Sequence, residues 1–135
     1  HMKHQPASEY HGQRADFYYA RYRRTNNATD ITEALRLSPT HGPSLYTRAG
    51  FIQAAVGRRS DVRGRAAYWC LADIYRNVAA TTTDGRTAAA ARQAASQFER
   101  AGPTREQYFL SEGWRPGQTV TASLGSYGSC STRVR

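Results

Sequence analysis

The sequence contains little lysine, little cysteine and no long apolar stretch. Lys3 is the only lysine, and Cys70 and Cys130 are the only cysteines. No apolar run approaches the roughly 18 residues that a membrane-spanning helix needs, so we expect no transmembrane segment. Hydrophobic residues make up 39% of the 135 positions, which predicts one domain with a lean core.

Sequence motifs for catalysis are also missing. No pair of His or Cys residues has the spacing of zinc ligands, and no Gly-rich phosphate loop precedes a helix. Ser126 lies in Gly-Ser-Tyr-Gly, which differs from the Gly-x-Ser-x-Gly elbow of hydrolases. His11 and His41 are isolated, and we expect ordinary surface or loop histidines. The sequence therefore predicts a protein that is not an enzyme and that holds neither a metal nor a cofactor.

Positive charge is in excess, and it is carried almost entirely by arginine. The formal net charge is +9, which favours a nucleic acid or an acidic protein as partner. Most arginines are scattered, with one tight cluster near residue 23 and more in the polar segment after residue 57. Nucleic-acid binding is therefore the alternative function, and it would use Arg21, Arg23, Arg24, Arg58, Arg59, Arg63 and Arg65.

The first helix is expected over residues 9–24, after a disordered stretch at residues 1–8. His1-Met2 looks like the remnant of an expression tag, and a signal peptide is presumed to have been removed. Aromatic and arginine residues share this helix, and two interpretations stay open. They form a binding face, or Phe17, Tyr18 and Tyr22 enter the core while the arginines stay solvated near the helix end.

The stretch from Ile31 to Gly57 predicts a helix, a tight turn and a second helix. Ser38 stands before a proline and should end the first helix, while Pro43 suits the first turn of the next. Leu45 opens an apolar series at steps of four and three residues, and Gly57 ends it. We expect the two helices to pack antiparallel, with Thr29 or Asp30 capping the first and Glu33 completing a capping box.

The remaining chain predicts three more helices and a hairpin. Polar residues 58–65 should form a projecting loop, with Ser60 or Asp61 capping a central helix over residues 62–80. An Ala-rich helix follows over residues 87–101. A short helix, capped by Thr104 with Gln107, should turn Tyr108, Phe109 and Leu110 inward. Residues 119–134 alternate as in a β-hairpin, with Val120, Ala122 and Leu124 pointing one way. The hairpin would lean on the helices through Val120, Leu124 and Tyr127.

The residues around the predicted turn resemble the junction between two tetratricopeptide repeats. Ala34, Leu35 and Pro39 match the closing pattern of one repeat. Leu45, Ala49 and Ile52 match the opening pattern of the next, with Leu45 where Trp is common and Ile52 where Tyr is common. Ala15 and Tyr18 repeat the small–large spacing 34 residues earlier. The resemblance implies a mainly α fold of antiparallel helix pairs over residues 9–112.

A second resemblance covers residues 65–135, which look like the C-terminal part of tetratricopeptide-repeat proteins of Bacteroidetes. The matching residues are Tyr68-Trp69, Pro103-Thr104-Arg105-Glu106, Tyr108-Phe109, Gly113 to Gly117 and Thr132-Arg133-Val134-Arg135. This resemblance implies that residues 113–135 form a turn and a short hairpin packed on the helices.

Cys70 and Cys130 leave two interpretations open. A disulfide between them would close a long loop and would indicate a periplasmic or cell-envelope location. Two free thiols are the alternative, with a cytoplasmic location.

The predicted function is a non-catalytic interaction or scaffolding module. A peptide or protein segment, an acidic one included, would dock on the concave face made by the first helix of each repeat. The predicted contact residues are Tyr19, Arg23, Tyr46 and Gln53.

Overall fold

The computed structural model describes residues 7–135, and helices dominate it, as predicted. Expected disorder at residues 1–8 lies outside the described residues except for Ala7 and Ser8, which belong to the first helix. The helices are α1 (Ala7–Thr25), α2 (Thr29–Leu37), α3 (Gly42–Val56), α4 (Val62–Thr81), α5 (Gly85–Ala101) and α6 (Arg105–Glu112). Within residues 7–135 no helix is both long and apolar enough to cross a membrane.

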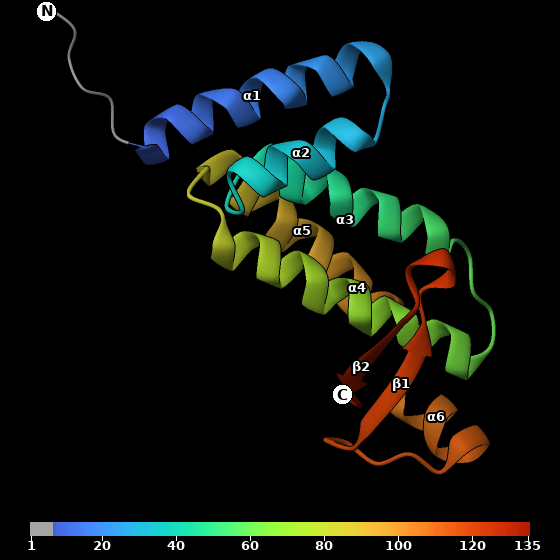
Figure 1. Ribbon diagram of the computed structural model, residues 1–135. Helices are drawn as coiled ribbons and strands as arrows, with labels where there is room; N and C mark the ends of the chain where they lie inside the picture. The colour runs from blue at the N-terminus through green and yellow to red at the C-terminus, as the bar shows by residue number, and fades with distance from the viewer. Residues whose placement is uncertain (1–6) are drawn as a thin grey trace, which may run out of the picture.

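The helices form an elongated stack (Figure 1). Helices α1 and α2 lie at one end, α3, α4 and α5 make up the middle, and α6 lies with the two strands at the other end. Helix α4 is central, because it packs against α3, α5, α6 and both strands.

The predicted break between α2 and α3 is confirmed. Ser38 follows α2 in an extended conformation, and its N–H donates to the carbonyl of Ala34. Pro43 occupies the first turn of α3, and Gly57 ends that helix with a positive φ of 62°, which favours glycine. Proline and glycine residues close to these positions therefore determine where α2 ends and where α3 begins and ends.

The predicted capping of α2 is wrong. Neither Thr29 nor Asp30 caps its first turn, where Asn27 Oδ1 instead accepts from the Thr29 N–H at 3.1 Å, and the two carboxylates have other partners. Asp30 accepts hydrogen bonds from Arg21 of α1 at 2.6–3.1 Å, and Glu33 pairs with Arg36. The capping box of α6 between Thr104 and Gln107 is confirmed.

The loop before α4 was expected to project, but it lies against the protein. The backbone N–H of Arg59 donates to the Tyr68 hydroxyl at 2.7 Å. The Arg59 guanidinium donates to the carbonyls of Val56 at 2.8 Å and Ser123 at 3.2 Å. Asp61 precedes α4 as predicted, but its side chain makes no capping hydrogen bond.

Two buried clusters form the core, and α4 contributes to both. Trp69 is central to the cluster shared with α6 and the strands, while Tyr75 belongs to the cluster shared with α2, α3 and α5. The Phe98 ring of α5 touches both clusters and stacks on Tyr75 at 5.9 Å between ring centroids. Gly102 is required beside Trp69, because a Cβ there would collide with the indole ring.

Phe109, Leu110 and Tyr127 were expected to face the helices but are exposed, and so is Phe17, which only one of the two interpretations placed in the core. Phe17 is 55% exposed, because each residue turns a helix by about 100° and Ala15 takes the buried face. The same geometry turns only Tyr108 of α6 inward and leaves Phe109 and Leu110 61% and 76% exposed. Tyr127 sits in an exposed 3₁₀ turn.

The predicted hairpin is confirmed as a two-stranded antiparallel sheet. Strand β1 (Thr119–Ser123) pairs with β2 (Ser129–Arg133), and a 3₁₀ turn over residues 125–127 joins them. Val120, Ala122 and Leu124 are buried on one side, as the alternation predicts. Ala122 stands opposite Cys130 and Val120 opposite Thr132.

Candidate functional site

Two of the four predicted contact residues, Tyr46 and Gln53, lie on one face of α3, and Tyr75 contacts both of them. The rings of Tyr46 and Tyr75 pack at 5.5 Å between centroids. The buried Tyr75 hydroxyl donates to Gln53 Oε1 at 2.6 Å, which fixes the amide and leaves its N–H groups without a partner among residues 7–135. Burial, with a smaller contribution from Tyr46, raises the pKa of Tyr75 to about 12, so the hydroxyl stays protonated and able to donate.

These two residues border successive hollows between α3 and α5, which we call the α3–α5 groove. The larger hollow, about 510 Å³, is lined by Gly50, Gln53, Ala54, Gly57, Arg58, Tyr68, Phe98 and Ala101. The smaller, about 230 Å³, is lined by Tyr46, Ala90, Gln93, Ala94 and Gln97. Small residues and glutamines predominate, and Arg58 provides a positive charge at one end.

The other two predicted contacts lie elsewhere. The Tyr19 ring packs against His41 at 5.8 Å and Tyr22 at 6.5 Å between centroids, so it helps to hold α1 on α3. Arg23 is exposed in the last turn of α1. Neither residue lines the α3–α5 groove.

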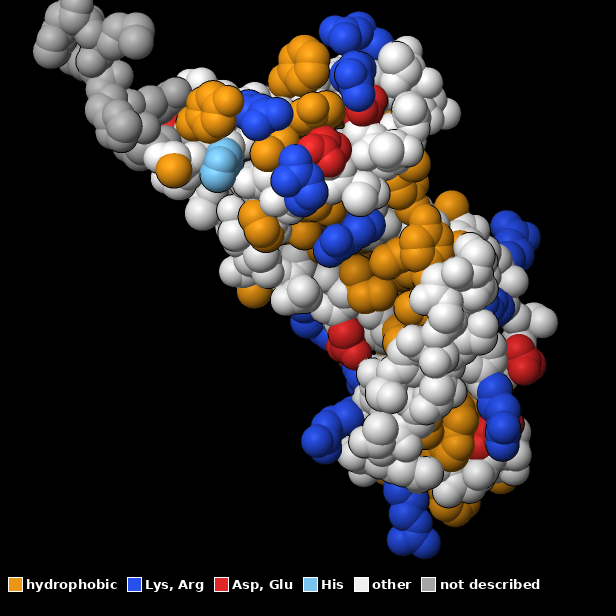
Figure 2. Space-filling model, viewed as in Figure 1, with side chains coloured by type: hydrophobic (Ala, Val, Ile, Leu, Met, Phe, Trp, Pro, Cys, Tyr) orange, Lys and Arg blue, Asp and Glu red, His pale blue; other side chains and the backbone are white. Residues whose placement is uncertain are grey.

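The arginines of the nucleic-acid alternative do not form one surface. Four of them bind the protein's own groups: Arg21 binds Asp30, Arg59 binds backbone carbonyls, Arg63 binds Glu112, and Arg65 binds Gln107 and two carbonyls. The three without such partners in the described part of the chain are Arg23, Arg24 and Arg58. Figure 2 shows basic side chains in separate small groups over one face of the molecule.

His41 lies in the loop before α3, in line with the expectation of a surface or loop histidine, but it is buried and belongs to an Asp–His–Ser array. A carboxylate can only accept, so His41 Nε2–H donates to Asp16 Oδ1 at 2.6 Å, while Nδ1 lies 2.8 Å from Ser44 Oγ. Ser44 is completely buried, and no substrate can reach its hydroxyl in this structure. The array therefore links α1 to the start of α3. No sequence motif indicates this array, because Asp16 and His41 are 25 positions apart.

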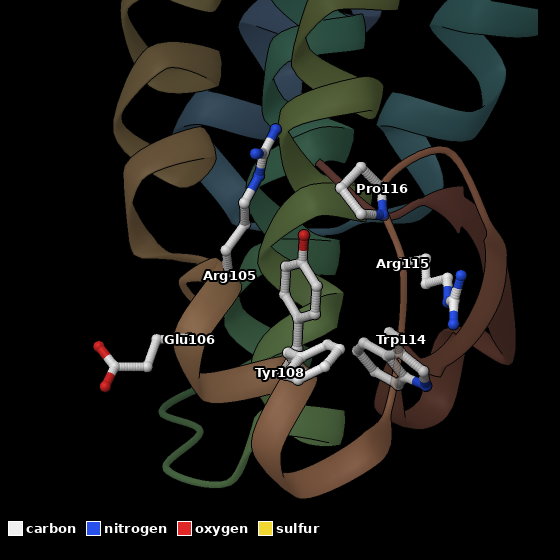
Figure 3. Close-up of a pocket in the computed structure, with 7 residues that line it drawn as sticks. Arg105, Glu106, Tyr108, Trp114, Arg115 and Pro116 are labelled. Atoms are coloured by element: carbon white, nitrogen blue, oxygen red, sulfur yellow. The ribbon is translucent and has the colours of Figure 1, made fainter.

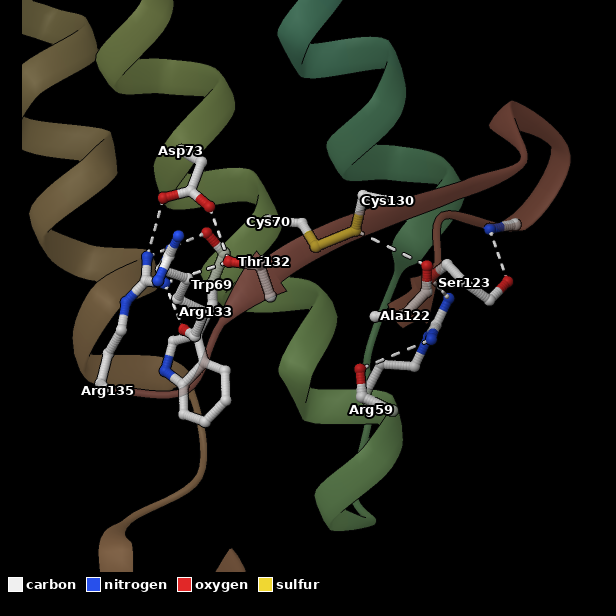
Figure 4. The surroundings of a disulfide bond; sticks show 12 residues. Arg59, Trp69, Cys70, Asp73, Ala122, Ser123, Cys130, Thr132, Arg133 and Arg135 are labelled. Carbon is white, nitrogen blue, oxygen red and sulfur yellow. Dashed lines mark hydrogen bonds and ion pairs between the residues drawn. A yellow bond between two sulfur atoms is a disulfide. The ribbon is translucent and has the colours of Figure 1, made fainter. Parts of the chain in front are cut away.

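Cys70 of α4 and Cys130 of β2 form a disulfide, with their Cα atoms 6.3 Å apart (Figure 4). The hairpin is held on α4 beside this bond by polar contacts. The Thr132 hydroxyl donates to Asp73 Oδ2 at 2.6 Å, and Arg135 donates to Asp73 Oδ1 at 2.8 Å. The bridged state of the two cysteines is therefore the one that the structure adopts, while the cellular location that it would indicate stays a prediction.

Arg135 also binds Glu99 of α5, at 2.6 Å and 3.1 Å. Burial by itself raises the pKa of Glu99, but the hydrogen bonds and charges of Arg135 and Arg76 outweigh burial and hold the pKa below its ordinary value. Glu99 therefore remains ionised as a partner for both guanidinium groups.

A larger pocket of about 580 Å³ opens beside α6, and the sequence interpretation missed it. It is lined by Arg105, Glu106, Tyr108, Phe109, Trp114, Arg115 and Pro116, and we call it the α6 pocket. Figure 3 shows the Tyr108 and Trp114 side chains between Arg105 on one side and Arg115 on the other. The only available signal was the density of aromatic and arginine residues in 105–116.

Among residues 7–135, no group of three or more His, Cys, Asp or Glu residues could hold a metal ion. Comparison with known proteins found no matching family model, no matching curated protein and no matching solved structure. The resemblance to tetratricopeptide repeats therefore stays a prediction.

Proposed function

We propose that this protein is a non-catalytic interaction module that binds an extended peptide segment of a partner protein in the α3–α5 groove. The observation that carries this proposal is the position of Tyr46 and Gln53. Both were predicted as contacts, both are held by Tyr75, and both border a hollow of the same groove.

The groove offers the groups that a peptide needs. The free N–H groups of Gln53 and the amides of Gln93 and Gln97 can donate to and accept from a peptide backbone. Glycine and alanine on the groove surface allow that backbone to approach closely. Tyr46 presents an aromatic face, and aromatic residues are common anchors at protein interfaces.

An acidic peptide fits the groove best. Arg58 lines one end, and the protein carries a formal net charge of +9. Complementary charge raises association rates and selects partners more than it raises affinity. We therefore expect carboxylates in the partner segment to meet the Arg58 end of the groove.

The proposal includes a tetratricopeptide-type arrangement, in which α3 and α5 are first helices of successive pairs and line a concave face. It also includes an oxidising location such as the periplasm or cell envelope, because a Cys70–Cys130 disulfide is stable in such compartments. Nucleic-acid binding is the weaker candidate, since four of its seven arginines already bind the protein's own groups.

The test is to select binders from a library of random displayed peptides and to map one of them by backbone amide chemical shifts. The proposal predicts shifts concentrated in α3 and α5. Shifts confined to other elements, or failure to select any peptide, would contradict it. A parallel titration with short single-stranded DNA tests the alternative, which requires affinity that falls steeply with salt.

A further inference from the structure

We propose that the α6 pocket is a second docking site, which takes a large apolar side chain of a partner protein that stands next to an acidic residue. This site is separate from the α3–α5 groove, with which it shares no lining residue. It therefore does not depend on the function proposed for the groove.

The floor of the α6 pocket is rigid and aromatic. Tyr108 is fully buried, and its ring contacts Trp69 at 6.0 Å and Trp114 at 6.3 Å between centroids. The Tyr108 hydroxyl donates to the carbonyl of Arg135 at 2.7 Å, so the polar end of the ring is satisfied away from the pocket. Because this apolar floor is preformed, little conformational entropy is lost when a partner covers it.

The wall of the pocket is apolar and unusually exposed. Phe109 lines the pocket with 61% of its surface exposed, and the neighbouring Leu110 is 76% exposed. Single exposed apolar residues are ordinary, but an exposed pair beside an aromatic hollow is typical of an interaction surface. Covering Phe109 and filling the hollow are the main apolar gains that a partner can make here.

The charges around the pocket select the partner. The side chains of Arg105 and Arg115 have no hydrogen-bond or ion-pair partner within residues 7–135, and they stand on opposite sides of the rings (Figure 3). Glu106 is the only acidic lining residue, and its carboxylate points away from the rings. A guanidinium pairs well with a carboxylate, so an acidic residue adjoining the apolar side chain completes the fit.

The experiment selects displayed random peptides on a variant in which Ala90→Glu fills the smaller hollow of the α3–α5 groove. We expect the enriched peptides to combine a large apolar residue with an adjacent Asp or Glu. One such peptide is then titrated against the same protein carrying a second change, either Arg115→Glu in the pocket or Arg24→Glu as control. Arg24 is exposed on α1, at the other end of the molecule, and its replacement changes the net charge equally.

Arg115→Glu should weaken binding at least about tenfold, and Arg24→Glu by less than about twofold. Phe109→Ala should weaken binding similarly without unfolding the protein, because Phe109 is largely exposed. The proposal is overturned if no peptide is enriched, if the enriched peptides lack an acidic position, or if the two charge reversals act equally. Self-association that Phe109→Ala abolishes would assign the pocket to a second copy of the chain and would also overturn it.

Discussion

Arg135 reaches Glu99 across 36 positions of sequence and binds it with two hydrogen bonds, at 2.6 Å and 3.1 Å. The same guanidinium binds Asp73 of α4 and lies 5.7 Å from the centre of the Trp69 ring. One side chain therefore ties the segment after β2 to α4 and α5, and Figure 4 shows its bond to Asp73 of α4.

Replacing Arg135 by Ala should lower the free energy of unfolding by about 1–2 kcal/mol. Charge-assisted hydrogen bonds are stronger than neutral ones, but solvent weakens them at this half-buried site. Arg133→Ala is the matched control, because Arg133 makes only one long side-chain contact, to the carbonyl of Gly117 at 3.4 Å. Urea denaturation of both variants measures the difference. Equal losses would show that the ion pairs contribute nothing measurable.

The disulfide should stabilise the folded protein by restraining the unfolded chain. The loop between Cys70 and Cys130 spans 60 positions, for which the chain-entropy model gives about 4 kcal/mol. Oxidised protein should therefore unfold at higher denaturant concentration than reduced protein, and its mass should be lower by two hydrogens. Cys70→Ala should remove the difference between oxidising and reducing conditions. Two alkylatable thiols in air-oxidised protein would contradict the bond.

Tyr75 should make the protein sensitive to alkali. Its pKa is about 12 in the folded protein and about 10 when unfolded, so the folded state holds the proton more tightly. The resulting stability is present below about pH 10 and is lost as the pH rises through the folded pKa. We expect a loss of about 1 kcal/mol between about pH 9 and about pH 11 from this group. Tyr75→Phe should show a smaller loss, and parallel pH profiles would contradict the assignment.

Truncating a buried aromatic residue should lower the free energy of unfolding much more than truncating an exposed one. Trp69 is 1% exposed, and Trp69→Ala should cost about 3–5 kcal/mol. Phe109→Ala should change stability by less than about 0.5 kcal/mol, because its ring faces solvent. Chemical denaturation compares them directly. A large loss in Phe109→Ala would show that α6 packs differently from the arrangement described above.

Features that depend on nearby residues were predictable from the sequence. Pro43, Gly57 and the Thr104–Gln107 capping box act within one or two turns, and the structure has each of them where expected. The central helix was also predictable, since it was expected over residues 62–80 and is found over Val62–Thr81. The short α6 offered three successive apolar residues, and spacing alone could not decide which one is buried.

Features that depend on residues far apart in the sequence were not predictable. Asp30 is an obvious helix cap by its position, yet Arg21 of the preceding helix takes its carboxylate. His41 looks isolated until the fold brings Asp16 beside it. The α6 pocket forms where α6, the following turn and the Trp69 ring meet, so no local sequence motif predicts it. For the candidate site, the sequence predicted Tyr46 and Gln53 on α3 but not the lining from α5.

The most direct test of the proposed function compares two neighbouring alanines of α5. Ala90 lines the α3–α5 groove, whereas Ala89 is exposed and lines no hollow of that groove. Glutamate at either position adds the same charge and the same helix propensity. For a peptide mapped to α3 and α5, Ala90→Glu should weaken binding at least about tenfold, which corresponds to about 1.4 kcal/mol, while Ala89→Glu should leave it unchanged. Equal affinities of the two folded variants would contradict peptide binding in the groove.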